Sequence, residues 1–245
     1  MSPTSTVEVD VDHHGQIAHL TIPGGLFHAT VAADLVAAVS DIVEDRAIRA
    51  VTLGAHGDFC TGPGPDLDRI GQHPDPATAL SRLRPPVIVS ISGACRSVGL
   101  EIALTADVRI CSPDATFAMN DITQGELPCW GGTQRLPRAI RPAEAAAMIL
   151  LGVDLDAERA RSLGLVHTVG EQPVRERDRL VELLLERGPL ALELAKEAVH
   201  RGSEMPLRDG LRLEGDLNHL LAATEDRAEG LAAFFAKRPP DFTGR

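Results

Sequence analysis

Two glycine-containing loops are the segments of this 245-residue sequence best suited to do chemistry. Residues 59–67 read Phe-Cys-Thr-Gly-Pro-Gly-Pro-Asp-Leu, and residues 93–99 read Gly-Ala-Cys-Arg-Ser-Val-Gly before a predicted helix that carries Glu101. Each loop follows a predicted strand, and α/β sheets place their sites at the carboxyl ends of strands. Two N–H groups aimed at one point, as at a helix start, would stabilise an oxyanion. Taken alone, the glycines are explained more simply as tight turns.

The hydrophobic pattern predicts the elements that must position these loops. Alternating apolar residues predict a hairpin over residues 7–21, and apolar residues at helical spacing predict a helix over residues 30–44. Buried strands and helices are expected to alternate through the rest of the first half, at residues 48–53, 77–83, 87–91, 100–106 and 108–111. Such alternation through short connections indicates a largely parallel sheet covered by helices.

The second half of the chain changes character at Pro142. Ala, Leu, Glu and Arg recur there at helical spacing, interrupted by glycines and prolines. This pattern predicts four or five helices and one short strand near residues 165–169. We expect a core domain over residues 1–188 and a C-terminal helical region over residues 189–245.

Composition narrows the classes of partner. The formal net charge of −11 argues against nucleic acid and against an anionic membrane surface. The apolar runs are shorter than the ~20 residues that a membrane span needs. The four cysteines show no metal-ligand spacing, so we expect no metal site. With no signal peptide recognised, free thiols and a cytoplasmic location are expected.

Several motifs follow one another along the chain. They are the two loops with the strands before them, Glu101 and Asp107, the hexapeptide Gly131-Gly132-Thr133-Gln134-Arg135-Leu136, the helix of residues 157–166, and the C-terminal segment of residues 234–242. From about residue 17 to residue 245 this series resembles the enoyl-CoA hydratase/isomerase superfamily, also called crotonase. Several ordered motifs at matching separations are far more specific than any one of them.

The resemblance implies a fold of repeated ββα units with a C-terminal helical region that trimerises, in a homotrimer or a dimer of trimers. It implies an acyl-CoA substrate, with coenzyme A as part of that substrate and no separate cofactor. Two main-chain amides would bind the thioester oxygen, and two carboxylates would activate one water. By position these carboxylates are Glu101 and Asp121, the second standing where hydratases carry Glu.

The first loop departs from the family pattern, which has one residue before Asp-Leu where this chain has Pro63-Gly64-Pro65. Proline has no N–H, so Gly64 is the expected first oxyanion donor. If Pro63 or Pro65 occupies the position instead, the hole loses a donor worth roughly 3 kcal/mol of transition-state stabilisation.

The second loop and the second carboxylate depart as well. The family's glycine triplet is Ser97-Val98-Gly99 here. Val98 is the expected second donor, although a β-branched residue tolerates positive φ poorly. The Asp121 carboxylate would lie ~1.5 Å further back than that of Glu. Water could still bridge this gap, Asp121 could make only turn contacts, or Glu126 could take its place.

Further residues are expected to contact the substrate. They are Asp66 and Leu67 in the first loop, Arg69 beside a phosphate, and Lys237 at the nucleotide end of coenzyme A, although Lys237 could equally be a solvated C-terminal residue. Trp130 is expected to line the acyl pocket and to limit its size.

The resemblance favours a hydratase-like lyase, in which a carboxylate takes a proton from water and the anion hole holds the enolate. Double-bond isomerisation, decarboxylation and thioester hydrolysis use the same enolate and stay open. A non-catalytic acyl-CoA-binding scaffold is the rival from another class, because the departures fall at positions that carry chemistry.

Overall fold

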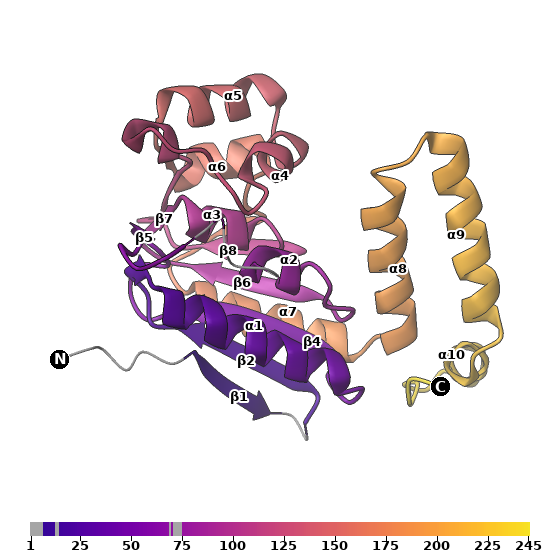
Figure 1. Cartoon of the computed structure of the whole chain (residues 1–245). Helices are drawn as coiled ribbons and strands as arrows, with labels where there is room; N and C mark the ends of the chain where they lie inside the picture. The colour runs from indigo at the N-terminus through magenta and orange to yellow at the C-terminus, as the bar shows by residue number, and fades with distance from the viewer. Residues whose placement is uncertain (1–6, 13–14, 69, 71–74) are drawn as a thin grey trace. The chain divides into compact units, whose positions relative to one another are not determined.

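The chain forms two compact units. A computed structural model describes residues 7–12, 15–68, 70 and 75–245 (Figure 1). The first unit comprises Met1–Leu83 and Val87–Arg179, and the second comprises Arg84–Pro86 and Leu180–Arg245. The expected boundary between residues 188 and 189 stays a prediction.

A six-stranded sheet forms the centre of the first unit, in the order β1-β2-β4-β6-β8-β11. β1 pairs with β2 in an antiparallel hairpin, and the other neighbouring strands pair in parallel. This confirms both the predicted hairpin and the largely parallel sheet. The strands are β1 (Glu8–Asp12), β2 (Ile17–Ile22), β4 (Ala50–Ala55), β6 (Val87–Ile91), β8 (Val108–Cys111) and β11 (Thr168–Val169).

Helices on the sheet complete an aliphatic core. Every residue of β6 is buried, as expected for a parallel strand covered on both faces. Helix α1 (Ala29–Glu44) buries Val31, Leu35, Val39 and Ile42, whose spacing places them on one face. Helix α2 (Pro76–Leu80) packs beside α1.

Short strands that the sequence pattern does not predict run along the two loops. β3 (Leu26–Phe27) pairs in parallel with β5 (Gly62–Pro63) in the first loop. β7 (Ala94–Arg96), β9 (Thr116–Ala118) and β10 (Leu155–Asp156) form a three-stranded sheet that includes the second loop. Strands of two or three residues are too short to show a hydrophobic period, which is why sequence analysis missed them.

The helices outnumber the predicted ones. Residues 142–245, all of them described, form six helices instead of four or five. In the second unit, α8 (Pro189–Gly202) and α9 (Leu207–Ala222) pack side by side (Figure 1). The remaining helices are α3 (Val98–Ala103), the 3₁₀ helix η1 (Asp121–Gln124), α4 (Gly132–Ala139), α5 (Pro142–Leu151), α6 (Ala157–Leu163), α7 (Pro173–Leu185) and α10 (Glu225–Ala236).

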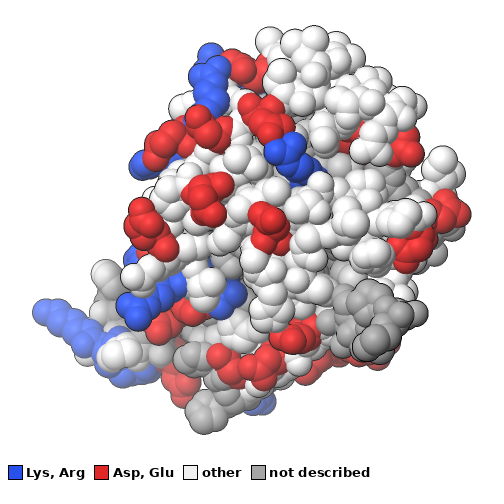
Figure 2. Space-filling model, turned by 90° about the vertical axis from the view of Figure 1, so that its left-hand side faces the viewer, with Lys and Arg blue, Asp and Glu red and all other residues white. Residues whose placement is uncertain are grey.

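The surface reflects the acidic composition. Figure 2 shows acidic side chains spread over one face, with fewer basic side chains among them. Within the described residues, no helix combines the length and hydrophobicity that crossing a bilayer requires. The same part of the chain holds no group of three His, Cys, Asp or Glu side chains suited to a metal ion.

Candidate active site

The second loop ends where α3 begins, and this junction positions Glu101. The Ser97 carbonyl accepts the Glu101 N–H at 3.0 Å, while the Ser97 N–H donates to the Ala118 carbonyl at 3.0 Å. Val98 is the first residue of α3, where an N–H group has no acceptor within the helix. The backbone strain expected at Val98 falls on Ser97 instead, which has a φ of +48°. The role of the Val98 N–H as an oxyanion donor stays a prediction.

The Glu101 carboxylate is fully buried and is held by main-chain groups. Its Oε1 atom accepts N–H groups from Trp130 at 2.7 Å and Gly132 at 2.8 Å. Two N–H donors on one oxygen orient the carboxylate and offset part of the cost of burying it. These two hydrogen bonds thus join α3, which carries Glu101, to the start of the hexapeptide of residues 131–136.

Steric fit explains the hexapeptide glycines. Gly131 has a φ of +101°, a conformation that L side chains rarely adopt. A Cβ atom on Gly132 would lie 2.8 Å from the Cβ of Pro128 and 2.9 Å from the side chain of Met119. Both glycines are therefore needed to bring the Trp130 and Gly132 N–H groups onto Glu101.

Asp121 is the other carboxylate expected to be catalytic. It opens η1 with only 4% of its surface exposed, and its Oδ1 atom accepts the Ser97 hydroxyl at 2.5 Å. This bond crosses to the second loop, so Asp121 does more than make turn contacts within its own segment. Glu126 is exposed and donates its backbone N–H to the Asp121 carbonyl at 3.2 Å. Asp121 is thus buried and Glu126 is not, and a catalytic role for either stays a prediction.

The first loop corrects the prediction for Gly64. The Gly64 N–H donates to the Phe27 carbonyl at 2.8 Å and so does not point into an anion hole. The cause is the pairing of β5 with β3, in which Pro63 stands opposite Phe27. Successive backbone groups of a strand face opposite edges, so the Pro63 nitrogen is directed away from β3. α3 also contacts β5, but proline offers no N–H there.

The two loops lie against each other, as their shared place at strand ends predicts. The Cys60 N–H donates to the Ala94 carbonyl at 2.8 Å, and the Arg96 N–H donates to the Cys60 carbonyl at 2.9 Å. A Cβ atom on Gly99 would lie 2.2 Å from the Cβ of Cys60, so only glycine fits there. Burial raises the pKa of the Cys60 thiol to about 11, which keeps it protonated and unsuited to nucleophilic attack.

Asp66 has a structural partner that sequence analysis missed. Its carboxylate contacts His28 Nδ1 at 2.7 Å and accepts the Ala29 N–H at 3.2 Å, at the start of α1. The hydrogen bond with His28 lowers the pKa of Asp66. Leu67 is half-buried against the core. Substrate contact by Asp66 and Leu67 stays a prediction, and Arg69 lies outside the described residues.

Trp130 contributes to the site through its backbone as well as its ring. Its side chain is buried, and the ring packs edge-on against Phe27, with centroids 5.9 Å apart. Its N–H holds Glu101. Phe27, whose carbonyl accepts the Gly64 N–H, therefore links the first loop to the segment that holds Glu101. The role of Trp130 in limiting the acyl pocket stays a prediction.

Lys237 belongs to the second unit, where it ends α10 with an exposed side chain. Next to it, Arg238 forms two hydrogen bonds to the Glu229 carboxylate, at 2.5 and 2.7 Å. Glu229 also accepts the Asp241 N–H at 2.8 Å, and these bonds lower its pKa to about 2. The cation beside Lys237 is thus already paired, and phosphate binding by Lys237 stays a prediction.

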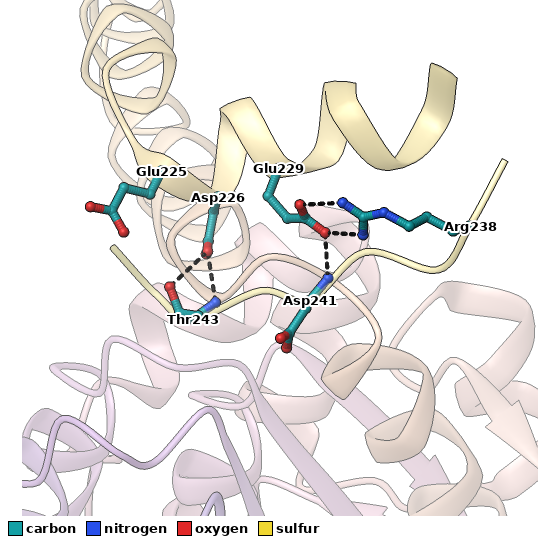
Figure 3. Close-up of a pocket in the computed structure, with 6 residues that line it drawn as sticks. All are labelled: Glu225, Asp226, Glu229, Arg238, Asp241 and Thr243. Atoms are coloured by element: carbon teal, nitrogen blue, oxygen red, sulfur yellow. Dashed lines mark hydrogen bonds and ion pairs between the residues drawn. The ribbon is translucent and has the colours of Figure 1, made fainter. Parts of the chain in front are cut away.

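A surface pocket of about 400 Å³ surrounds this ion pair in the second unit (Figure 3). On its other side Asp226 accepts the Thr243 N–H at 2.7 Å and the Gly244 N–H at 3.0 Å. The lining carboxylates therefore hold the C-terminal residues against α10. This pocket contains none of the predicted catalytic residues.

Comparisons with known proteins identify the family of the chain. The family model described as "Enoyl-CoA hydratase/isomerase" matches residues 26–245. The 2,3-dehydroadipyl-CoA hydratase of Escherichia coli K12 is 37% identical over 195 residues, which cover 74% of this chain and 76% of that protein. A human mitochondrial enoyl-CoA hydratase domain-containing protein 2 is 34% identical, covering 86% of this chain and 79% of the relative.

Solved structures show the same architecture. The enoyl-CoA hydratase of Bacillus anthracis aligns with a TM-score of 0.87 and 29% identity, over 97% of this chain and 99% of that one. The enoyl-CoA hydratase of Mycobacterium tuberculosis H37Rv aligns with a TM-score of 0.89 and 26% identity, over 97% and 99% of the two chains. With its crotonase-like α/β fold, the chain therefore belongs to the enoyl-CoA hydratase/isomerase family.

Proposed function

We propose that this protein is a hydratase-like lyase that adds water to α,β-unsaturated acyl-CoA thioesters. The observation that carries the proposal is the pair of buried carboxylates, Glu101 and Asp121, both tied to the residues around the start of α3. A reaction that moves protons to and from carbon needs such fixed acid–base groups. The hydratase names of the relatives support the same reaction class.

The proposed reaction uses the two carboxylates on one water. Glu101 takes a proton from the water as the water oxygen bonds to the β-carbon of the substrate. The electron pair of the double bond moves toward the thioester oxygen and forms an enolate. A proton then returns to the α-carbon, so that the water's H and OH are both added. Asp121 orients the water, and the Val98 N–H stabilises the enolate oxygen. Coenzyme A is part of the substrate, and the proposal needs no other cofactor.

A second candidate function follows from the first loop. Because Gly64 bonds to Phe27 and Pro63 has no N–H, the loop supplies no main-chain donor from these two positions. Loss of one oxyanion donor slows related reactions by about 10²–10³-fold. An acyl-CoA-binding protein with little or no turnover is therefore the alternative.

The assembly and the carrier contacts are part of the proposal. We infer a homotrimer or a dimer of trimers, with Arg69 and Lys237 placed to meet phosphates of coenzyme A. Large exposed hydrophobic residues on the helices of the second unit support burial in an oligomer. They are Val199, Leu207, Leu211, Leu220, Phe234 and Phe235.

A panel of trans-2-enoyl-CoA substrates of increasing chain length tests the function. Hydration removes the conjugated double bond, so absorbance of the conjugated thioester falls as product forms. Glu101→Gln and Asp121→Asn should slow this loss, while the exposed control Glu126→Gln should not. Product analysis distinguishes the related reactions: a shifted double bond indicates isomerisation, and free coenzyme A indicates hydrolysis. Binding of acyl-CoA by wild type without turnover would favour the alternative.

A further inference from the structure

Ser97 has a backbone conformation that a residue with a side chain rarely adopts. Its φ is +48° and its ψ is −121°, a combination that favours glycine because a Cβ atom crowds the backbone. Among the described residues, the one other non-glycine with positive φ is Lys237, at 53° and 40°. That is the ordinary left-handed conformation that ends a helix. Among the described non-glycine residues with positive φ, Ser97 is therefore the one whose conformation is not explained by the end of a helix.

Hydrogen bonds on both sides lock this conformation. The Ser97 N–H donates to Ala118 at the end of β9, and the Ser97 carbonyl accepts the Glu101 N–H in α3. The residue is only 2% exposed. Its backbone thus joins the segment leading to Asp121 with the helix that carries Glu101. A glycine would make the same two backbone bonds without the strain.

The hydroxyl is what glycine would lack. Ser97 Oγ donates to Asp121 Oδ1 at 2.5 Å, and both side chains are buried. A short hydrogen bond to a buried carboxylate is stronger than one between neutral groups and restricts rotation of that carboxylate. The single residue Ser97 therefore contacts both carboxylate residues of the site, Glu101 through its backbone and Asp121 through its side chain.

We propose that Ser97 is a positioning residue for the Asp121 carboxylate, and that the strained backbone is maintained because it aims the hydroxyl at Asp121. The inference rests on the proposed function, in which Asp121 orients the attacking water. Asp is one methylene shorter than the Glu of hydratases, so its carboxylate has less reach. A hydroxyl that fixes its orientation limits the loss that follows from the shorter side chain.

Two substitutions separate the hydroxyl from the strain. Ser97→Gly removes both, whereas Ser97→Ala removes the hydroxyl and keeps the Cβ atom. We expect kcat for enoyl-CoA hydration to fall about tenfold or more in both variants, with KM changed by less than about twofold. We also expect Ser97→Gly to melt at a higher temperature than Ser97→Ala, because only the glycine relieves the strain. The buried control Ser112→Ala should keep wild-type kcat.

A stability cycle with Asp121→Ala tests whether the hydroxyl acts through Asp121. The destabilisation caused by Ser97→Ala should largely disappear when Asp121 is already Ala. Wild-type kcat in Ser97→Gly, with Glu101→Gln inactive, would overturn the positioning role and leave hydration intact. Absence of turnover in wild type would overturn hydration alone. The stability cycle would then decide whether Ser97 holds Asp121, and an undiminished effect of Ser97→Ala in the Asp121→Ala background would overturn that role.

Discussion

The first loop, residues 59–67, and the second loop, residues 93–99, both follow a buried parallel strand, and their backbones are hydrogen-bonded to each other. They differ in what they do with their amide groups. The first loop forms the short strand β5, and the N–H of Gly64, directly after it, is bonded to the Phe27 carbonyl. The second loop leads into a helix, whose first N–H groups have no intrahelical acceptor.

This difference indicates that the two loops contribute differently to the proposed reaction. The second loop is close to every group that the proposed chemistry needs, because Val98, Glu101 and the hydroxyl that holds Asp121 all lie within five residues of one another. The first loop packs against the second loop and is hydrogen-bonded to it through the backbone of Cys60. An anion hole built mainly by one loop would bind a thioester more readily than it stabilises an enolate.

The largest expected effect is at Glu101, in the helix α3 that follows the second loop. Glu101→Gln keeps an oxygen that can accept the Trp130 and Gly132 N–H groups but removes the proton acceptor. We expect kcat for enoyl-CoA hydration to fall about 10³-fold, which is typical for loss of a general base. Steady-state kinetics on the absorbance of the conjugated thioester measure this change. Unchanged kcat would show that Glu101 is not the general base, and the proposed difference between the two loops would then be wrong.

The next effect concerns the contact between the loops. Gly99→Ala places a Cβ atom 2.2 Å from the Cβ of Cys60, and neither backbone can move without disturbing its loop. Overpacking of this kind should lower the free energy of unfolding by about 3 kcal/mol, measured by urea denaturation. The matched control is Gly215→Ala in α9, where nothing lies within 4 Å and alanine favours the helix. Equal stability of the two variants would show that the loops are not tightly packed.

How far the sequence predicts these loops depends on the range of the interactions. The parallel sheet and helix α1 were predictable because their hydrophobic period runs over many residues. The place of both loops at strand ends follows from that sheet. Glu101 and Asp121 were identified by resemblance, and the structure buries both.

The details of the first loop were not predictable in the same way. Whether the Gly64 N–H faces a substrate or another strand depends on Phe27, far away in the sequence. The contact of Asp66 with His28 likewise joins residues 38 positions apart. The strain at Ser97 escaped prediction because a serine in sequence carries no sign of positive φ. Such features arise from tertiary contacts that one-dimensional patterns do not contain.

A gain of function in the first loop would sharpen the comparison. Pro63→Ala introduces an N–H group at residue 63. This group would be directed away from β3, whereas the Gly64 N–H is directed toward β3. If the missing donor limits turnover, kcat should rise about tenfold, part of the 10²–10³-fold that a donor contributes. The control Pro65→Ala, in an exposed part of the same loop, should leave kcat unchanged. An unaltered rate in Pro63→Ala would exclude this position from the anion hole.

The smallest effect concerns the Cys60 thiol, which lies where the loops meet. Burial raises the pKa of Cys60 from 9.0 to about 11, so the folded state holds its proton more tightly than the unfolded state. The resulting stabilisation is fully present below pH 9 and is lost as the pH rises toward 11. At pH 10 the loss should be about 1 kcal/mol. Urea unfolding at pH 8 and pH 10 should therefore show a smaller alkaline decrease in Cys60→Ala than in wild type. The non-titrating control Ser112→Ala should retain the wild-type decrease. An identical decrease in Cys60→Ala would mean that water reaches the thiol, and that the contact between the loops is looser than their hydrogen bonds indicate.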